Sequence, residues 1–331
     1  MMPMRRPMSG GAILAFHSIT TPELPGEGTA HVSLEAFQSF IRVARRLGEL
    51  VRLSELVRRH QHGQSTSGLI AVTLDDAYAA LHGEFREFVL QEAVPITVFV
   101  VTQAAAIAAR YWWDRIDDVF PRVAPDRWRA FEDVCGVPDE YRRGQPRHHG
   151  PLRPLRQWLL AAYAGRWPGH LEPALQALEH GAGFRTRQRS MTFAELAELA
   201  AIPWVEVGVH TVSHPVLPLL SDPDLRQEIE GAYADLRERF ATVLPILAVP
   251  FGLFDQRTLR AAGAAGMTAS CTVAGGTLNG DAPSHVLPRV CVGRSDTPTT
   301  LGLRLLGLRE LVRRCLGRPV SLFPDLPSAT T

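Results

Sequence analysis

The sequence predicts an α/β fold with a mostly parallel sheet, and its periodicity alone fits either an open sheet or a (β/α) barrel. Apolar, β-branched runs typical of buried strands alternate with amphipathic helical patterns, giving about seven βα units. Polar side chains follow several of these strands at their carboxyl ends, where α/β folds place their sites. Several strand ends converge on one mouth more easily in a barrel than in an open sheet. With 46% hydrophobic residues, the 331-residue chain can bury such a core.

The predicted elements follow one another in a regular order. Helix starts are indicated by Ser33, by the capping box from Thr192 to Glu195, by Ser221 before an Asp-Pro-Asp segment, and by Asp255. The predicted strands are 12–17, 68–74, 96–102, 204–209, 246–250, 267–273 and 286–292. The predicted helices are 33–47, 79–92, 125–134, 152–163, one from 192, 221–240 and one from 255.

We expect one domain over residues 1–331, with an insertion at 104–190 and a helical tail at 296–331. A βα connection needs only a few residues, so the long segment between the strands at 96–102 and 204–209 is an insertion. It opens with Arg110-Tyr-Trp-Trp-Asp-Arg115. Aromatic faces beside a carboxylate suit sugar recognition, but adjacent tryptophans also anchor insertions to a barrel. Both interpretations remain open on the sequence.

Composition excludes several classes of function. The net charge is +1, with acids and bases dispersed, so nothing indicates a nucleic-acid partner. All 35 basic residues are arginine, which excludes Schiff-base catalysis and a P-loop phosphate site, since both need a lysine amine. The four cysteines lack Cys-x-x-Cys spacing and are expected to be buried, reduced thiols. No signal peptide or membrane span is evident, so we expect a cytoplasmic location, peripheral to a membrane at most.

Two pairs of residues carry the chemistry. Asp75 and Asp76 follow the apolar run 68–74, while His210 and His214 follow the run 204–209. Two imidazoles four residues apart can face one ion, and neutral imidazole favours zinc and related metals. The alternative is that the aspartates cap a helix and face solvent. Taken together, two acidic groups and two histidines at the ends of apolar strands favour a metal site, because unpaired buried charge is costly.

These motifs resemble those of the polysaccharide deacetylases, the NodB-homology carbohydrate esterases. That family's Thr-Phe-Asp-Asp-Gly and His-Ser/Thr-x-x-His motifs are similar to Thr73-Leu-Asp-Asp-Ala77 and His210-Thr-Val-Ser-His214. Further matches, in the same order as in the family, are Ile13-Leu-Ala-Phe-His-Ser18, Ile96-Thr-Val-Phe-Val-Val-Thr102 and Ala248-Val-Pro-Phe-Gly252. The resemblance covers about residues 11–103 and 191–295, and it implies an incomplete or distorted (β/α) barrel of about seven strands.

The resemblance also implies roles for individual residues. Asp76, His210 and His214 would hold a divalent metal, with zinc as the expected ion, and Asp75 would be the general base. The backbone N–H of Phe251 would help to stabilise the oxyanion. The family's Leu-x-His motif, whose histidine protonates the departing amine, is missing. His17 and His285 are the candidates to replace it, and either could instead be structural.

Further departures concern the surroundings of the predicted base. Arg289 lies inside the last predicted strand and is expected to pair with Asp75. It would replace the arginine that many relatives carry before the proline of the family's Tyr-Pro-x-Gly segment, which is similar to Ala248-Val-Pro-Phe-Gly252 here. A purely structural ion pair is the alternative. Ala77 stands where the family has glycine, and Val249 stands where it has tyrosine.

The resemblance therefore predicts a metal-dependent N-deacetylase, a hydrolase of non-peptide carbon–nitrogen bonds. Its substrate would be an N-acetylated or N-formylated amino sugar in a glycan or glycan precursor. The alternatives are a catalytically silent carbohydrate-binding protein on the same fold and a metal-dependent hydrolase of a non-sugar amide. The oligomeric state is not predicted.

The tail places leucines at helical spacing over residues 301–316, with arginines toward one face. Such a helix could lie on an anionic membrane and bring the enzyme to a lipid-linked sugar. The alternative is that it packs its leucines on the barrel and exposes its arginines.

Overall fold

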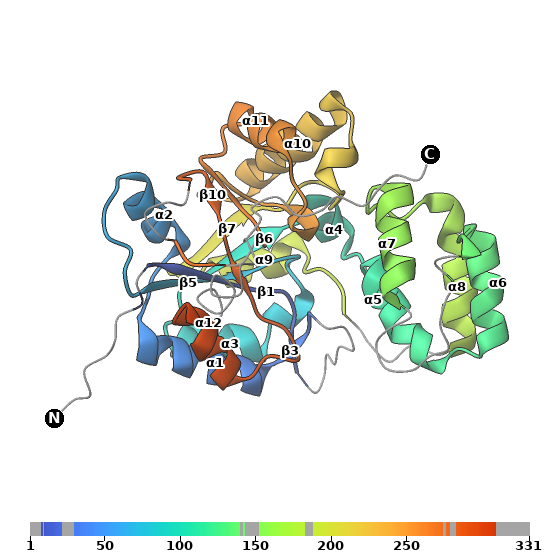
Figure 1. Cartoon of the computed structure of the whole chain (residues 1–331), viewed down its shortest axis with the longest axis horizontal. Helices are drawn as coiled ribbons and strands as arrows, with labels where there is room; N and C mark the ends of the chain where they lie inside the picture. Colours follow the sequence, from blue (N-terminus) through green and yellow to red (C-terminus); the bar gives the residue numbers. More distant parts are fainter. Residues whose placement is uncertain are drawn as a thin grey trace.

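The computed structural model describes residues 8, 10–21, 30–139, 142, 152–182, 188–273, 276–278 and 283–308. Its centre is one curled sheet in which every strand pairing is parallel, and this confirms the predicted distorted barrel (Figure 1). From edge to edge the strands are β10 (Val286–Leu287), β9 (Ala269–Cys271), β8 (Ile246–Ala248), β7 (Val205–Val209), β6 (Ile96–Val100), β5 (Leu69–Leu74), β1 (Ala12–Phe16) and β11 (Val290–Cys291). β4 (Glu49–Leu50) also pairs with β5, while β2 (Ile19–Thr20) and β3 (Val32–Ser33) form a separate pair.

The last predicted strand is divided in two. Pro288 and Arg289 interrupt it, because proline has no N–H to donate to a sheet. The first half, β10, pairs with β9, and the second half, β11, pairs with β1. Consecutive segments thus reach both edges of the sheet, and Arg289 lies between them with its side chain fully buried.

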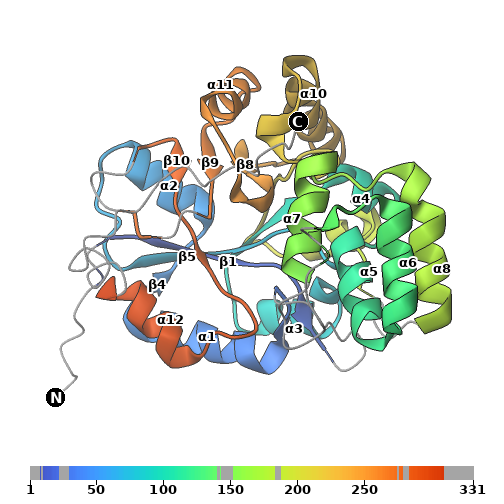
Figure 2. The same ribbon diagram turned by 45° about the vertical axis from the view of Figure 1, so that its right-hand side comes forward.

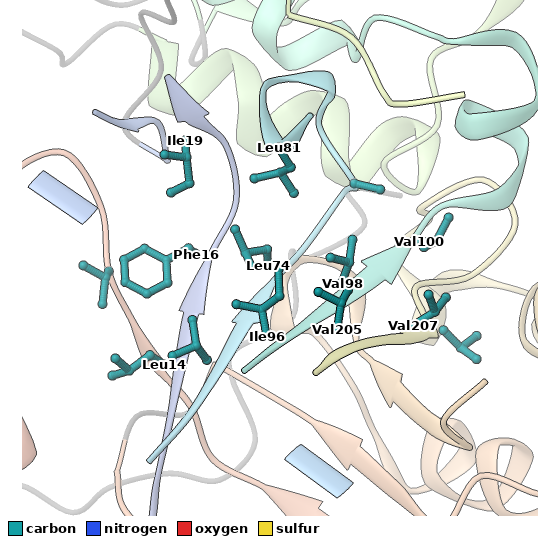
Figure 3. Packing of buried hydrophobic residues seen from close by; sticks show 14 of the residues in the cluster. Leu14, Phe16, Ile19, Leu74, Leu81, Ile96, Val98, Val100, Val205 and Val207 are labelled. Carbon is teal, nitrogen blue, oxygen red and sulfur yellow. The ribbon is translucent and has the colours of Figure 1, made fainter. Parts of the chain in front are cut away.

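The strands are buried on both faces of the sheet, and successive side chains of a strand point to opposite faces. Leu14 and Val98 belong to the large cluster that the sheet forms with the surrounding helices (Figure 3). Their neighbours Ile13 and Phe99 point to the opposite face and form a second cluster. A Cβ atom on Gly208 would lie 2.5 Å from the Phe99 ring, so the adjacent strand β7 needs glycine there. Such continuous burial explains why the strands read as unbroken apolar runs.

Helices flank the sheet on both sides (Figure 2). Ser33, Thr192 and Asp255 cap three of them as predicted, each accepting a hydrogen bond from a backbone N–H of the first turn. The predicted helix 79–92 is instead a 3₁₀ turn, Ala79–Leu81, followed by the helix α3 (Glu84–Gln91). The flanking helices are α1 (Leu34–Leu47), α2 (Leu53–Gln61), α3 (Glu84–Gln91), α4 (Thr102–Ile107), α9 (Phe193–Ala200), α10 (Asp222–Arg239), α11 (Gln256–Ala264) and α12 (Pro298–Leu305).

Between α4 and α9 the chain forms a group of helices beside the sheet (Figure 1). They are α5 (Trp112–Val119), α6 (Pro125–Cys135), α7 (Leu152–Tyr163) and α8 (Glu172–Ala182). These helices share a hydrophobic cluster of their own, which contains Ile116, Phe131, Leu159 and Leu175. The fold thus includes the predicted helical insertion.

Three cysteines lie within the described residues, and all are free thiols. Cys135 and Cys271 are buried, and Cys291 is half-buried. Burial raises the pKa of Cys135 and of Cys271 to about 12, which keeps both thiols protonated. Cys315 lies outside the described residues.

Candidate metal centre

Parallel strand ends bring the predicted ligands together. Asp75 and Asp76 directly follow β5, and His210 directly follows β7. The backbone N–H of Asp75 donates to the carbonyl of Phe16, and that of His210 donates to the carbonyl of Val100. Each of the two segments therefore stays paired with its neighbouring strand up to its first site residue. Both segments end at the same edge of the sheet, where the carboxyl ends of the strands lie.

Asp76, His210 and His214 form the candidate metal site, which is called the metal-binding cluster below. Their ligand atoms all lie within 4.8 Å of one another, and no other such group occurs among the described residues. The Nε2 atoms of His210 and His214 each lie 3.5 Å from Oδ1 of Asp76. This oxygen is buried and has no hydrogen-bond partner among the described residues. Buried acceptors are rarely left unpaired, so these side chains fit a divalent ion between them.

The other ring nitrogen of His210 fixes its orientation. Nδ1 lies 2.8 Å from the carbonyl oxygen of Ala248 and donates to it. This contact selects the tautomer whose Nε2 lone pair faces Asp76, which is the usual arrangement around a metal-binding histidine. The charge of Asp76 raises the pKa of His210 despite burial, whereas burial lowers the pKa of His214 to about 3.

Asp75 is paired with Arg289, as the sequence predicted. Two hydrogen bonds of 2.7 Å join the guanidinium to both carboxylate oxygens, and both side chains are buried. Burial alone would raise the pKa of Asp75, but the charge of Arg289 outweighs it and holds that pKa well below its usual range. The pair with Arg289 therefore favours the ionised form of Asp75. Arg289 also donates to the hydroxyl of Thr73, at 3.2 Å.

The backbone around the cluster is strained. Five residues other than glycine have left-handed φ values here: Asp76 (69°), Ala77 (48°), Thr211 (69°), His214 (59°) and Phe251 (55°). Each such residue costs on the order of 1–3 kcal/mol, which the surrounding structure must offset. Ala77 occupies the position where the family has glycine, and its φ shows why glycine is the easier choice.

The remaining candidates lie at different distances from the cluster. His17 follows β1 and is half-buried, close enough for its charge to lower the pKa of both Asp75 and Asp76. The Phe251 ring packs edge-on against the His214 ring, with 4.5 Å between their centres. His285 is exposed at the amino end of β10, while the cluster lies beyond the carboxyl ends of the strands. Of the two histidines considered as general acid, only His17 is near the cluster.

Sequence reasoning missed a buried hydrogen-bonded network behind Asp76. Tyr111 donates to the carbonyl of Asp76 at 2.7 Å, and Tyr78 donates to Asp114 at 2.6 Å. His31 lies 2.9 Å from the other oxygen of Asp114. Trp113 donates to the Tyr78 hydroxyl at 3.1 Å. The Arg110–Arg115 segment thus connects the insertion to the ligand loop.

The two adjacent tryptophans have different surroundings. Trp112 is buried in the insertion's own hydrophobic cluster and donates to the carbonyl of Gly165, which also lies in the insertion. Trp113 is half-buried, and its ring centre lies 5.0 Å from that of His214 and 5.8 Å from that of Phe251. Its ring therefore borders the metal-binding cluster.

Glu228, on α10, was also missed. One of its oxygens accepts the backbone N–H groups of Val212 and Ser213, at 3.0 and 2.8 Å. The other accepts the Ser213 hydroxyl at 2.6 Å and Arg166 at 2.8 Å. Glu228 therefore holds the loop between His210 and His214 in place. Its position in the middle of an amphipathic helix gave no local signal of this role.

Comparisons with known proteins agree with this geometry. Residues 176–270 match the sequence profile of the family described as polysaccharide deacetylase. The resemblance to the polysaccharide deacetylases is confirmed. No curated protein matches the chain in sequence.

Solved structures share the deacetylase fold at low sequence identity. The deacetylase PplD of Streptococcus pyogenes, solved in complex with acetate, is 14% identical with a TM-score of 0.56, covering 89% of this chain and 97% of PplD. IcaB of Ammonifex degensii is 16% identical with a TM-score of 0.57, covering 90% and 97%. A polysaccharide deacetylase from Bacillus cereus is 13% identical with a TM-score of 0.56, covering 89% and 68%. The deacetylase fold thus extends over nearly the whole chain.

Proposed function

We propose that this protein is a metal-dependent N-deacetylase that removes an acetyl or formyl group from an amino sugar in a glycan or glycan precursor. The observation that carries the proposal is the unpaired, buried Oδ1 of Asp76 facing two imidazole nitrogens, beside a second carboxylate that Arg289 keeps ionised. Zinc is the proposed ion, because one carboxylate and two imidazoles suit it. The fold shared with PplD, solved with acetate, supports the same reaction.

Each residue near the cluster has a proposed part in the reaction. Asp76, His210 and His214 would hold the ion, which when bound supplies a Lewis acid that polarises the amide carbonyl. Asp75 takes the proton of the attacking water, since Arg289 keeps it ionised and correctly oriented. His17 would donate a proton to the departing amine, and the backbone N–H of Phe251 would donate to the oxyanion.

The test is acetate release by the purified protein. Metal is removed with a chelator, one divalent ion is restored at a time, and a panel of N-acetylated sugars is supplied, lipid-linked sugars included. Zinc-dependent release from at least one sugar is expected. Sugar binding without release would indicate a carbohydrate-binding protein, and release only from non-sugar amides would indicate the other alternative.

We also propose weak association of residues 301–316 with an anionic membrane surface. Leu301 and Leu305 of α12 are buried, but Leu303, Leu306 and Leu308 are 46%, 40% and 41% exposed. Residues 309–316 lie outside the described residues. No helix in the described ranges is long and apolar enough to cross a bilayer, so a surface contact is the form proposed.

A further inference from the structure

The turn that carries Asp76 is held in an unfavourable backbone conformation. Asp76 and Ala77 are consecutive and both left-handed, with φ values of 69° and 48°. They follow β5 and belong to no helix or strand, so no regular ladder of hydrogen bonds fixes them. A side chain with a Cβ atom disfavours this conformation, and contacts from elsewhere in the chain must therefore maintain it.

The insertion supplies these contacts where it leaves the barrel and where it returns. The side-chain hydroxyl of Tyr111 donates to the carbonyl of Asp76 at 2.7 Å, and both residues are buried. The backbone N–H of Met191 donates to the carbonyl of Ala77, also at 2.7 Å. Both carbonyl groups of the strained turn thus accept a hydrogen bond from a residue at one end of the insertion.

The two ends of the insertion are joined to each other. The backbone N–H of Ser190 donates to the carbonyl of Ala109 at 2.8 Å. The N–H of Ala79, just after the turn, donates to the carbonyl of Arg189 at 2.7 Å. Tyr111 therefore belongs to a frame that contacts the chain at the turn itself and directly after it.

The ring of Tyr111 is fixed independently of its hydroxyl. It stacks on Trp113 with 4.6 Å between ring centres and meets Tyr78 edge-on at 5.3 Å. Trp113 donates to the Tyr78 hydroxyl, which in turn donates to the buried carboxylate of Asp114. These contacts fix the direction of the Tyr111 hydroxyl. A phenylalanine in its place keeps the ring contacts and removes only the hydrogen bond to Asp76.

We propose that Tyr111 is a positioning residue for Asp76, whose hydroxyl holds the strained turn so that the carboxylate faces His210 and His214. The inference rests on the proposed metal-dependent function and adds what the insertion does for the metal site. The residue whose carbonyl Tyr111 holds is the one whose Oδ1 lies 3.5 Å from both imidazoles. Partners that orient a ligand in this way control metal affinity without touching the ion.

The test measures zinc affinity in the full chain by competition with a chelator. Tyr111→Phe should weaken zinc binding by roughly 10- to 100-fold, as loss of a partner that orients a ligand predicts. Tyr163→Phe is the matched control, since the ring of Tyr163 packs on Trp158 and His170 within the insertion. It removes the same atom from the same insertion and should bind zinc like wild type.

A second substitution tests whether the hydroxyl acts through the strained turn. Glycine adopts a left-handed φ without the cost that Ala77 incurs, so Ala77→Gly removes part of the strain. Tyr111→Phe combined with Ala77→Gly should regain zinc affinity by roughly 2- to 5-fold over Tyr111→Phe alone. A role for Tyr111 in holding the insertion alone predicts no such recovery. Melting temperatures of all variants are recorded beside the affinities.

Two outcomes would overturn the proposal while the proposed function stands. One is equal zinc affinity in Tyr111→Phe and wild type, with or without a lower melting temperature. The other is a double variant that binds zinc no more tightly than Tyr111→Phe. If wild type binds zinc but releases acetate from no sugar, the proposed function fails, and the affinities still decide the role of Tyr111. If wild type binds no divalent ion, both are rejected.

Discussion

Asp75 and Arg289 form one buried pair that has a structural part and, in the proposed function, a catalytic part. Arg289 lies where the last strand crosses from one edge of the sheet to the other, and both of its terminal nitrogens bond to Asp75. Removing one partner of a buried ion pair costs about 3–5 kcal/mol, because the other charge is left uncompensated. Loss of activity in a variant of Asp75 would therefore not by itself identify the general base.

A double variant separates the two roles. Asp75→Asn is expected to lower kcat by roughly 10²-fold or more while the protein keeps its metal, and also to lower the melting temperature. Asp75→Asn combined with Arg289→Gln forms a neutral hydrogen-bonded pair, and it should recover stability but not turnover. Thermal melts, metal content and acetate release are measured together. Recovery of turnover in the double variant would assign Asp75 a structural role only.

Asp76 provides the matched comparison for these variants. Asp76→Asn removes the ligand charge rather than the base, so the protein should lose its metal as well as its activity. If Asp75→Asn and Asp76→Asn lose metal to the same extent, the division of roles between the two carboxylates is wrong.

Metal affinity should depend on pH through His210. Asp76 raises the pKa of His210 above its usual value of 6.5, and burial lowers the pKa of His214 to about 3. His214 is thus already neutral near pH 6, whereas His210 must release a proton before it can bind an ion. Zinc affinity should therefore fall about tenfold per pH unit below the pKa of His210. A titration against a competing chelator between pH 5 and 8 measures this, and a constant affinity across that range would contradict it.

At the scale of elements, the sequence predicted strands better than connections. Buried runs such as 68–74 and 204–209 became strands, because a strand buried on both faces leaves an unbroken apolar signal. The predicted helix 79–92 was partly wrong: Gly83, with a φ of 80°, separates a 3₁₀ turn from α3. The interruption of the last strand at Pro288 was also missed, although proline signals such a break.

The candidate site was likewise predicted only in part from the sequence. Asp75, Asp76, His210 and His214 could be found because each pair directly follows a predicted strand. Glu228 and the network around Asp114 could not, since their partners lie on elements far away in the sequence and tertiary packing alone brings them together. Local sequence patterns predict which side chains follow a strand. They do not predict the distant residues that hold those side chains in place.

Glu228 offers a test of how α10 supports the metal-binding cluster. Glu228→Gln keeps the shape of the side chain but removes the charge that accepts two backbone N–H groups, a hydroxyl and Arg166. Because it orients the loop that ends in His214, zinc affinity should weaken by about 10- to 100-fold. Glu230→Gln, two residues along the same helix and exposed, is the control and should behave as wild type. Equal zinc affinities in both variants would limit Glu228 to a purely structural role.

At the scale of the whole molecule, the insertion and the last helix meet the barrel in different ways. The insertion has a hydrophobic cluster of its own and reaches the metal-binding cluster through the Tyr78–Asp114 network. Helix α12 instead packs on α1, with Leu301 and Leu305 buried in the main core. This supports the alternative in which the tail packs its leucines on the barrel, although Leu303, Leu306 and Leu308 of the same segment are exposed.

The membrane proposal must therefore be tested with a cut that spares α12. Removing residues 301–331 would take two leucines from the core, so we predict that chain to unfold or aggregate. Removing residues 309–331 keeps Leu301 and Leu305 in place and deletes four arginines: Arg309, Arg313, Arg314 and Arg318. Each basic residue near an anionic surface contributes about 1 kcal/mol, so this truncation should strongly reduce sedimentation with phosphatidylserine vesicles at low salt.

A second variant tests the exposed leucines themselves. Leu303→Ser with Leu306→Ser leaves every arginine in place, and both side chains are exposed, so the barrel should stay folded. If the helix inserts its apolar face, this variant binds vesicles more weakly than wild type even though the electrostatic attraction is unchanged. If only the charge matters, the variant binds vesicles as strongly as wild type, and raising the salt concentration releases both proteins from the vesicles. A full-length chain that does not sediment with anionic vesicles at low salt would reject membrane association, since neither the arginines nor the leucines would then contact lipid.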